Sequence, residues 1–244
     1  MEAVASMPAE PAPAPAGSRF YPYSGMLVTK DARTQFNAKG FSRYIWDFES
    51  SATENIYGRY VSYGHLEYHD FRNGGKSFHP EEAMWDWSYM PGATTIVLPP
   101  EMLQGKGGAS SGHRNFSDQA FLAGVGVSDS LAMFSVRLHD IAYDTTFRAD
   151  KSVFFFKDWI FCIGSGISSG DPEHPVVTTL FQDFSGNGQV HETGIGWMAE
   201  DGSFLYAVKN GTVRTSKDGL YTRTWIEHGP APENGSYGYF ILKD

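Results

Sequence analysis

The stretch Ser152-Val153-Phe154-Phe155-Phe156-Lys157-Asp158-Trp159-Ile160-Phe161-Cys162-Ile163 decides the fold class. It holds two short runs of β-branched and aromatic residues, which pack well on a pleated surface. The polar pair Lys157-Asp158 separates the two runs. Two apolar runs joined by two polar residues are typical of a β-hairpin. We therefore predict antiparallel strands on both sides of this pair.

Strand signals of the same kind recur along the chain, at 58–63, 94–98 and 197–206. In the last of these, Asp201-Gly202 predicts the turn of a second hairpin. No segment keeps a helical spacing of apolar residues for more than about two turns, so helix is expected only as short pieces at 31–38 and 99–104. The prediction is an all-β protein of antiparallel strands stacked in layers, with little helix.

The composition divides the chain into two parts. Residues 1–17 are rich in proline and alanine and predict a linker, without the basic and apolar regions of a secretory signal. Residues 18–244 form one predicted β-sandwich domain, and no apolar run in it is long enough to span a membrane. The apolar run at 237–242 predicts a strand. We expect this strand to lack a partner, which would leave an open edge and make the domain incomplete at its C-terminal end.

Charge and cysteine content narrow the possible functions. A net charge of −9 and a pI near 5.3 argue against a nucleic-acid-binding protein, which usually carries a basic patch. A polyanionic substrate would need a local basic cleft. Aromatic residues make up 15% of the chain; most are expected in the core, but such rings also stack on sugars. Cys162 is the only cysteine, so no internal disulfide forms, and its apolar surroundings predict a buried, inert thiol.

Common cofactor and metal motifs are absent from the sequence. It has no phosphate-binding loop, no dinucleotide-binding glycine pattern and no zinc-binding His or Cys pattern. His65 and His69 lie four residues apart, but on a strand this spacing separates them by roughly 13 Å. Metal ligands must lie about 2 Å from the ion, so we predict no metal site there.

Longer segments carry a family resemblance. The most specific are Trp85-Asp86-Trp87, continuing to Pro91-Gly92-Ala93-Thr94-Thr95-Ile96, then Lys151-Ser152-Val153, and Thr178-Thr179-Leu180-Phe181-Gln182. Segments 58–65, 163–167 and 225–229 add to them. In this order they resemble the central β-sandwich region of the chondroitin and hyaluronate lyase family, and they look closest to chondroitin sulfate ABC lyases. The resemblance runs from Phe20 to the last residue.

This resemblance implies an antiparallel super-sandwich with layered sheets like those of galactose mutarotase, preceded on the same chain by an α/α toroid. It implies β-elimination on acidic glycosaminoglycans: chondroitin sulfate, dermatan sulfate or hyaluronan. In the family a Tyr, a His and an Arg of the toroid act with a glutamate of the sandwich, and only the glutamate has a counterpart here. No cofactor is identified. A structural divalent cation would fit the family, but no acidic cluster identifies its ligands.

Site residues follow from the same segments. Trp46-Asp47-Phe48-Glu49, followed by Tyr57-Gly58-Arg59-Tyr60, resembles the segment that carries the family's glutamate, so Glu49 is the predicted catalytic residue. Its carboxylate would accept hydrogen bonds from the toroid's Arg or Tyr. The predicted substrate-binding residues are Arg43, Trp46, Arg59, His65, Trp85 and Trp87. Arginines bind sulfate or carboxylate well. On a strand, Trp85 and Trp87 would face the same side, as a sugar platform or as a core layer.

Three functions remain open at this point. The first is the sandwich part of a bacterial lyase, secreted or periplasmic, that acts together with its helical domain. The second is a stand-alone module that binds acidic polysaccharide without cleaving it. The third and weakest is a sugar epimerase of the mutarotase type, for which no matching motif is present. An upstream reading frame that encodes a helical domain would decide for the lyase.

Overall fold

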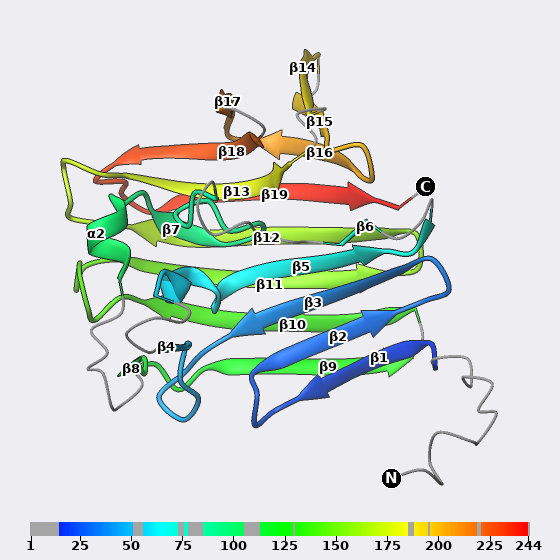
Figure 1. Ribbon diagram of the computed structural model, residues 1–244, viewed down its shortest axis with the longest axis horizontal. Helices are drawn as coiled ribbons and strands as arrows, with labels where there is room; N and C mark the ends of the chain where they lie inside the picture. The colour runs from blue at the N-terminus through cyan, green and yellow to red at the C-terminus, as the bar shows by residue number, and fades with distance from the viewer. Residues whose placement is uncertain are drawn as a thin grey trace, which may run out of the picture.

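The computed structural model describes residues 15–50, 56–72, 76–77, 85–104, 113–128, 130–184, 188–194, 196–218 and 221–243 (Figure 1). About 60% of the structure is strand and 4% is helix, and the sheets are antiparallel, which confirms the all-β prediction. Within the described ranges, no helix has the length and apolar character needed to cross a membrane. Residues 1–14 of the predicted linker lie outside these ranges, and the first strand already begins at Gly17.

One layer is a five-stranded sheet. Its order is β1 (Gly17–Tyr21), β2 (Met26–Lys30), β3 (Thr34–Gly40), β5 (Tyr63–Asp70) and β6 (Lys76–Ser77). The helical piece expected at 31–38 is wrong, because Thr34 opens strand β3. Along this strand Phe36 and Ala38 are buried, and this spacing of two residues points both into the core.

The second layer is an eight-stranded sheet. Its order is β14 (Gln189–Thr193), β15 (Gly196–Glu200), β16 (Leu205–Asn210), β19 (Gly235–Leu242), β12 (Trp159–Ser168), β11 (Arg148–Phe156), β10 (Leu131–His139) and β9 (Leu122–Ser128). Both predicted hairpins are confirmed: β11 and β12 pair on either side of Lys157-Asp158, and β15 and β16 pair around Asp201-Gly202.

Strand β19 corrects the expectation about residues 237–242. It pairs with β12 on one side and with β16 on the other, so it lies in the interior of the sheet. Its alternate residues Tyr237, Tyr239 and Ile241 are buried. The expected open edge is therefore wrong. The sequence shows the strand but not its partners, because neither β16 nor β12 is adjacent to β19 in the chain.

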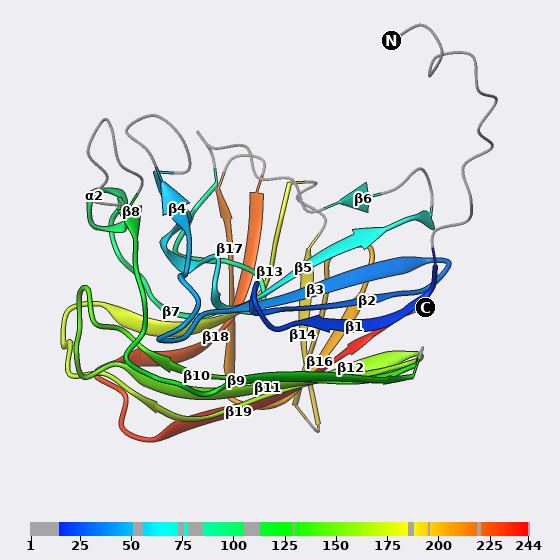
Figure 2. The same cartoon turned by 90° about the horizontal axis from the view of Figure 1, so that it is seen from below.

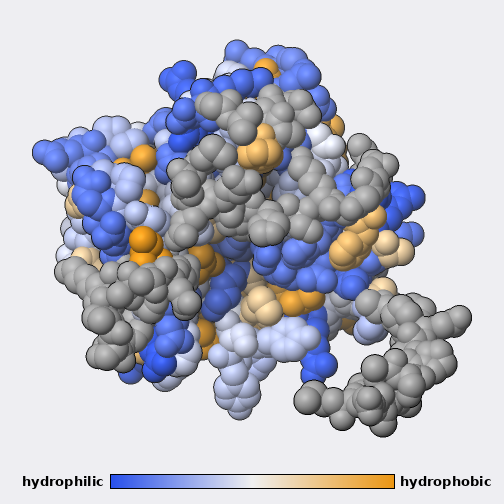
Figure 3. Space-filling view, in the orientation of Figure 1, coloured by the Kyte–Doolittle hydropathy of each residue, from blue (hydrophilic) through white to orange (hydrophobic). Residues whose placement is uncertain are grey.

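The two layers pack face to face, as Figure 2 shows from below. Leu27 and Phe36 of one sheet and Phe134 and Val136 of the other belong to the same buried core. The sheets approach closely at Gly40, where an added Cβ would lie 2.9 Å from the Phe134 ring. Cys162 is buried, as predicted. The described surface visible in Figure 3 is mainly hydrophilic, with apolar residues in small separate spots.

A third sheet has four strands. Its order is β17 (Thr212–Asp218), β18 (Tyr221–Pro230), β13 (Pro175–Asp183) and β7 (Thr94–Ile96). β13 is buried along most of its length, whereas β17 is mostly exposed.

Short elements gather at one end of the sandwich. They are β4 (Glu49–Ser50), β8 (His113–Arg114), the 3-10 helix η1 (Gly58–Tyr60) and α2 (Pro100–Leu103). Figures 1 and 2 both show α2, β4 and β8 at this end. Helix α2 confirms the short piece expected at 99–104. The strand expected at 58–63 is wrong, because η1 occupies its first half and β5 begins only at Tyr63.

Candidate functional site

The β4–β8 pair builds an exposed polar and aromatic surface. It places Glu49 opposite Arg114, whose guanidinium donates a hydrogen bond to the Glu49 carboxylate at 2.8 Å. Each of these side chains is 51% exposed. The same guanidinium lies 4.7 Å from the centroid of the Trp46 ring, which meets Phe116 edge-on at 6.3 Å. We call Trp46, Glu49, Arg114 and Phe116 the β4–β8 surface.

Asp47 is a buried residue that supports the β4–β8 surface through hydrogen bonds. Its carboxylate accepts hydrogen bonds from the Phe48 N–H at 2.5 Å and from the Asn115 side-chain amide at 3.1 Å. Burial raises the pKa of Asp47 to about 6, against the lowering effect of these hydrogen bonds. Asp47 thereby ties the segment before β4 to the segment after β8. Neither Asp47 nor Arg114 was among the residues predicted from the sequence.

Arg43 belongs to the same loop as Trp46. Its backbone N–H donates to the Gln119 carbonyl oxygen at 2.7 Å, which anchors the loop beside the segment before β9. Its exposed guanidinium lies 5.3 Å from the centroid of the Tyr44 ring, which is also exposed. This position leaves Arg43 accessible to a ligand.

Arg59 lies deeper in the molecule. Its guanidinium donates to the Asp140 carboxylate at 2.7 Å, and the two side chains are only 12% and 1% exposed. Arg59 lines a cavity of about 580 Å³ together with Asp47, Asn115 and Tyr143. Asp140 thus balances the charge of Arg59 within the structure.

Trp85 and Trp87 have different environments. Residues 85–90 are not in a strand: Trp87 and Ser88 lie in a turn closed by the Tyr89 N–H, which donates to the Asp86 carbonyl oxygen at 3.0 Å. Trp85 is only 6% exposed and meets Tyr221 edge-on, so it is a core residue. Trp87 is half-buried and stacks on Tyr57 with ring centroids 6.4 Å apart. Both line a second pocket, of about 870 Å³.

His65 lies inside the sandwich. Its Nδ1 lies 2.8 Å from the Pro91 carbonyl oxygen, and its burial lowers its pKa. The buried ring does not reach the surface, so the structure removes His65 from the binding set. His65 and His69 both lie on β5, as expected. Within the described parts of the chain, no group of three or more His, Cys, Asp or Glu residues is arranged to hold a metal ion.

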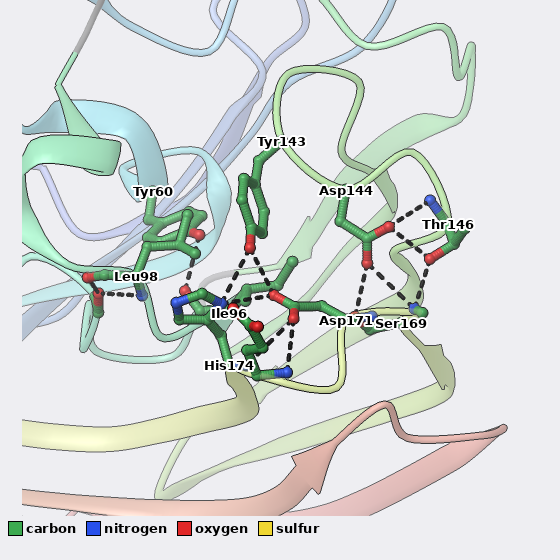
Figure 4. Close-up of polar contacts among 12 residues, drawn as sticks. Tyr60, Ile96, Leu98, Tyr143, Asp144, Thr146, Ser169, Asp171 and His174 are labelled. Atoms are coloured by element: carbon green, nitrogen blue, oxygen red, sulfur yellow. Dashed lines mark hydrogen bonds and ion pairs between the residues drawn. The ribbon is translucent and has the colours of Figure 1, made fainter.

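Sequence reasoning also missed a Tyr–Asp–His cluster (Figure 4). The Tyr143 hydroxyl donates to Asp171 Oδ2 at 2.7 Å, and His174 Nδ1 lies 2.8 Å from the same oxygen. Burial raises the pKa of Asp171, but hydrogen bonds from Glu173, Tyr143 and His174 outweigh it and hold the pKa below its usual range. Tyr143 lines the 580 Å³ cavity and His174 lines the 870 Å³ pocket. The cluster thus contributes one side chain to the 580 Å³ cavity and one to the 870 Å³ pocket.

Solved structures share this fold. The chondroitin AC lyase of Streptomyces coelicolor A3, in complex with chondroitin sulphate, superposes with a TM-score of 0.76 at 21% identity, over 99% of this chain and 34% of that one. The xanthan lyase of Paenibacillus superposes with a TM-score of 0.73 at 19% identity, over 93% of this chain and 25% of that one. At these identities the likeness shows the fold alone.

Two curated relatives are similar in sequence. The chondroitin sulfate ABC exolyase of Bacteroides thetaiotaomicron is 30% identical over 94% of this chain and 26% of its own length. The enzyme of the same name from Proteus vulgaris is 30% identical over 93% of this chain and 27% of its own length. The chain therefore spans about a quarter of the length of these relatives. Residues 16–194 match the super-sandwich domain of polysaccharide lyase family 8. On this match, the chain belongs to polysaccharide lyase family 8.

Proposed function

We propose that this chain is the central super-sandwich part of a larger lyase that degrades chondroitin-type glycosaminoglycans by β-elimination. The match of residues 16–194 to the family supports the reaction class. The names of the two curated relatives support the substrate class. The observation that carries the site is the β4–β8 surface, where a carboxylate, a guanidinium and two aromatic rings lie half-exposed at the loop-rich end of the sandwich.

The chemistry of β-elimination explains what this surface would do. One group must neutralise the uronate carboxylate and so acidify the C5–H bond, a base must remove the proton, and an acid must protonate the leaving oxygen at C4. We assign the base, the acid and the neutralising group to a helical domain on the same polypeptide. Glu49 accepts hydrogen bonds from an Arg or Tyr of that domain and so fixes its position during proton transfer.

Arg114 and Trp46 give Glu49 its setting. Arg114 orients the Glu49 carboxylate within this chain, without any contact from the helical domain. Its guanidinium is in turn packed against the Trp46 ring. Trp46 and Phe116 offer exposed ring faces and edges to a saccharide. The proposal includes a secreted or periplasmic location, where the enzyme would encounter such polysaccharides.

The test compares two proteins: the chain alone, and a longer polypeptide that contains it together with a helical domain. Each is incubated with chondroitin sulfate, dermatan sulfate and hyaluronan, and the ultraviolet absorbance of the unsaturated uronate is followed. We expect product only from the longer polypeptide, because separating groups that act together costs orders of magnitude in rate. If neither protein forms product while the chain alone binds chondroitin sulfate in calorimetry, the chain is a binding module and the proposal is wrong.

A further inference from the structure

The 870 Å³ pocket has an aromatic wall. Trp87 and Tyr57 line it with rings inclined by only 28° to each other, and both side chains are half-buried. Leu98, Pro99 and Pro100 form an apolar wall of the same pocket. Flat aromatic faces bind the apolar face of a pyranose ring, and a small apolar surface suits a methyl group.

His174 supplies a fixed polar group to this pocket. Asp171 accepts a hydrogen bond from Nδ1 at 2.8 Å, and it is itself held by the Glu173 N–H at 2.8 Å. Figure 4 shows the other ring nitrogen, Nε2, pointing away from Asp171. Nε2 makes no hydrogen bond with any residue that the structure describes, and the side chain is 23% exposed. A ring that donates from Nδ1 presents Nε2 as an acceptor when it is neutral.

The charges around the pocket select against an anionic ligand. Arg223 donates to Asp86 at 2.6 Å and lies 3.5 Å from Asp218, so two carboxylates surround one guanidinium. A third carboxylate, Asp171, lies behind His174. Carboxylates accept hydrogen bonds from sugar hydroxyls but repel sulfate and uronate groups.

We propose that this pocket binds an uncharged N-acetylhexosamine ring. The ring packs against Trp87 and Tyr57, one hydroxyl donates to His174 Nε2, and the acetamide methyl faces Pro99 and Pro100. Asp171 positions His174 for this contact. This proposal does not depend on a catalytic role of Glu49. If the pocket does not bind the sugar, the proposed lyase function still stands; if the lyase function is wrong, the pocket can still bind the sugar.

The experiment titrates the 244-residue chain with N-acetylgalactosamine, N-acetylgalactosamine 4-sulfate and galactose. Tryptophan fluorescence and ligand-detected NMR follow binding. We expect millimolar binding of N-acetylgalactosamine, and binding about tenfold weaker for galactose, which lacks the acetamide group. The sulfated sugar should bind at least as weakly as galactose. Absence of N-acetylgalactosamine binding would overturn the proposal, and so would equal binding of the sulfated sugar.

Two variants place the binding in this pocket. His174→Asn keeps an amide nitrogen near the Nδ1 position, where it still donates to Asp171, but deletes Nε2. Trp87→Phe keeps a smaller aromatic ring. It tests the same pocket independently, in case His174→Asn does not fold. We expect roughly tenfold weaker binding for His174→Asn and a severalfold loss for Trp87→Phe. The controls are His191→Asn on exposed strand β14 and Trp159→Phe on β12. The pocket assignment is wrong if the controls weaken binding as much as the pocket variants do.

Discussion

Arg114 donates a hydrogen bond to Glu49 at 2.8 Å across the β4–β8 pair while its guanidinium packs over the Trp46 ring. Glu49 is therefore held by a neighbour that was not evident from the sequence. Both charged side chains are half-exposed, so water screens the pair and it contributes at most about 1 kcal/mol to folding. Such a pair is better suited to orienting a carboxylate than to stabilising the fold.

We predict that Glu49→Gln in the complete enzyme lowers turnover by roughly 30- to 1000-fold and leaves the Michaelis constant nearly unchanged. The amide keeps the shape of the carboxylate but loses its charge, which matters most when charge develops during proton transfer. Steady-state kinetics on chondroitin sulfate measure the effect. The control is Glu54→Gln, five residues further on and outside the described residues. If only the Glu54 variant loses turnover, the catalytic glutamate of this segment is Glu54.

Arg114→Ala should also reduce turnover, by about tenfold, because it removes the hydrogen bond from Arg114 that orients the Glu49 carboxylate and the cation that packs on the Trp46 ring. Thermal unfolding should change little, since the pair is exposed. The matched control is Arg137→Ala, which breaks an equally exposed pair with Asp150 at 2.7 Å, with side chains 52% and 51% exposed. Equal turnover in the two variants would show that Arg114 does not position Glu49.

The buried pair of Arg59 and Asp140 should be far more important for stability. Asp140→Asn leaves the Arg59 guanidinium buried without its counter-charge, and the free energy of unfolding should fall by roughly 3 kcal/mol. The amide oxygen of the Asp140→Asn variant can still accept the hydrogen bonds that Asp140 Oδ1 accepts from the Ala142 and Tyr143 N–H groups, so the loss comes from the contact with Arg59. Urea unfolding measures it. Adding Arg59→Met to Asp140→Asn should restore part of the stability, and a further loss in the double variant would contradict this account.

Lys151 should make stability rise with pH. Its side chain is buried between the layers, where Nζ donates to the Gly92 carbonyl oxygen, and burial lowers its pKa to about 7. The unfolded chain keeps this proton to about pH 10, so between about pH 7 and 10 it binds more protons than the folded chain. Stability therefore increases with pH through this window, by at most about 1.4 kcal/mol per pH unit.

Urea unfolding of Lys151→Met at pH 7, 8 and 9 tests this account. The wild type should gain stability relative to the variant as pH rises. Burial lowers the pKa of Lys39 to about 8, but Lys39 is present in both proteins and cancels in the comparison. Lys157→Met, at the exposed β11–β12 turn, should run parallel to the wild type. Parallel curves for Lys151→Met as well would show that Lys151 is not neutralised near pH 7.

The sequence was sufficient where a feature depends on neighbouring residues. The hairpins at Lys157-Asp158 and Asp201-Gly202 are local, so the turn residues and flanking runs predicted them correctly. The error at 58–63 has a long-range cause. Tyr60 is buried, and its hydroxyl donates to the Ile96 carbonyl oxygen at 2.8 Å. Tyr60 makes this distant contact from a 3-10 turn, although the segment has strand propensity.

The candidate site could be predicted only in part for the same reason. Trp46 and Glu49 came from a contiguous segment, but Arg114 lies 65 residues away from Glu49 and meets it only because β4 pairs with β8. Tyr143 and His174 are 31 residues apart and join through loop contacts to Asp171. No spacing rule connects such residues, because the pairing of distant strands and the contacts between distant loops bring them together.

The interior position of β19 has a consequence for biosynthesis. On the ribosome, β9 to β12 can pair with one another as they emerge, since each is the neighbour of the next. The β14–β16 strands can join that group only through β19, which is translated last among the described strands. Until then the nascent chain exposes two incomplete half-sheets with unpaired edges, a state open to misfolding and to chaperone binding. Closing the sheet through β19 is thus a late, long-range step, and pairings of this kind are slow to form.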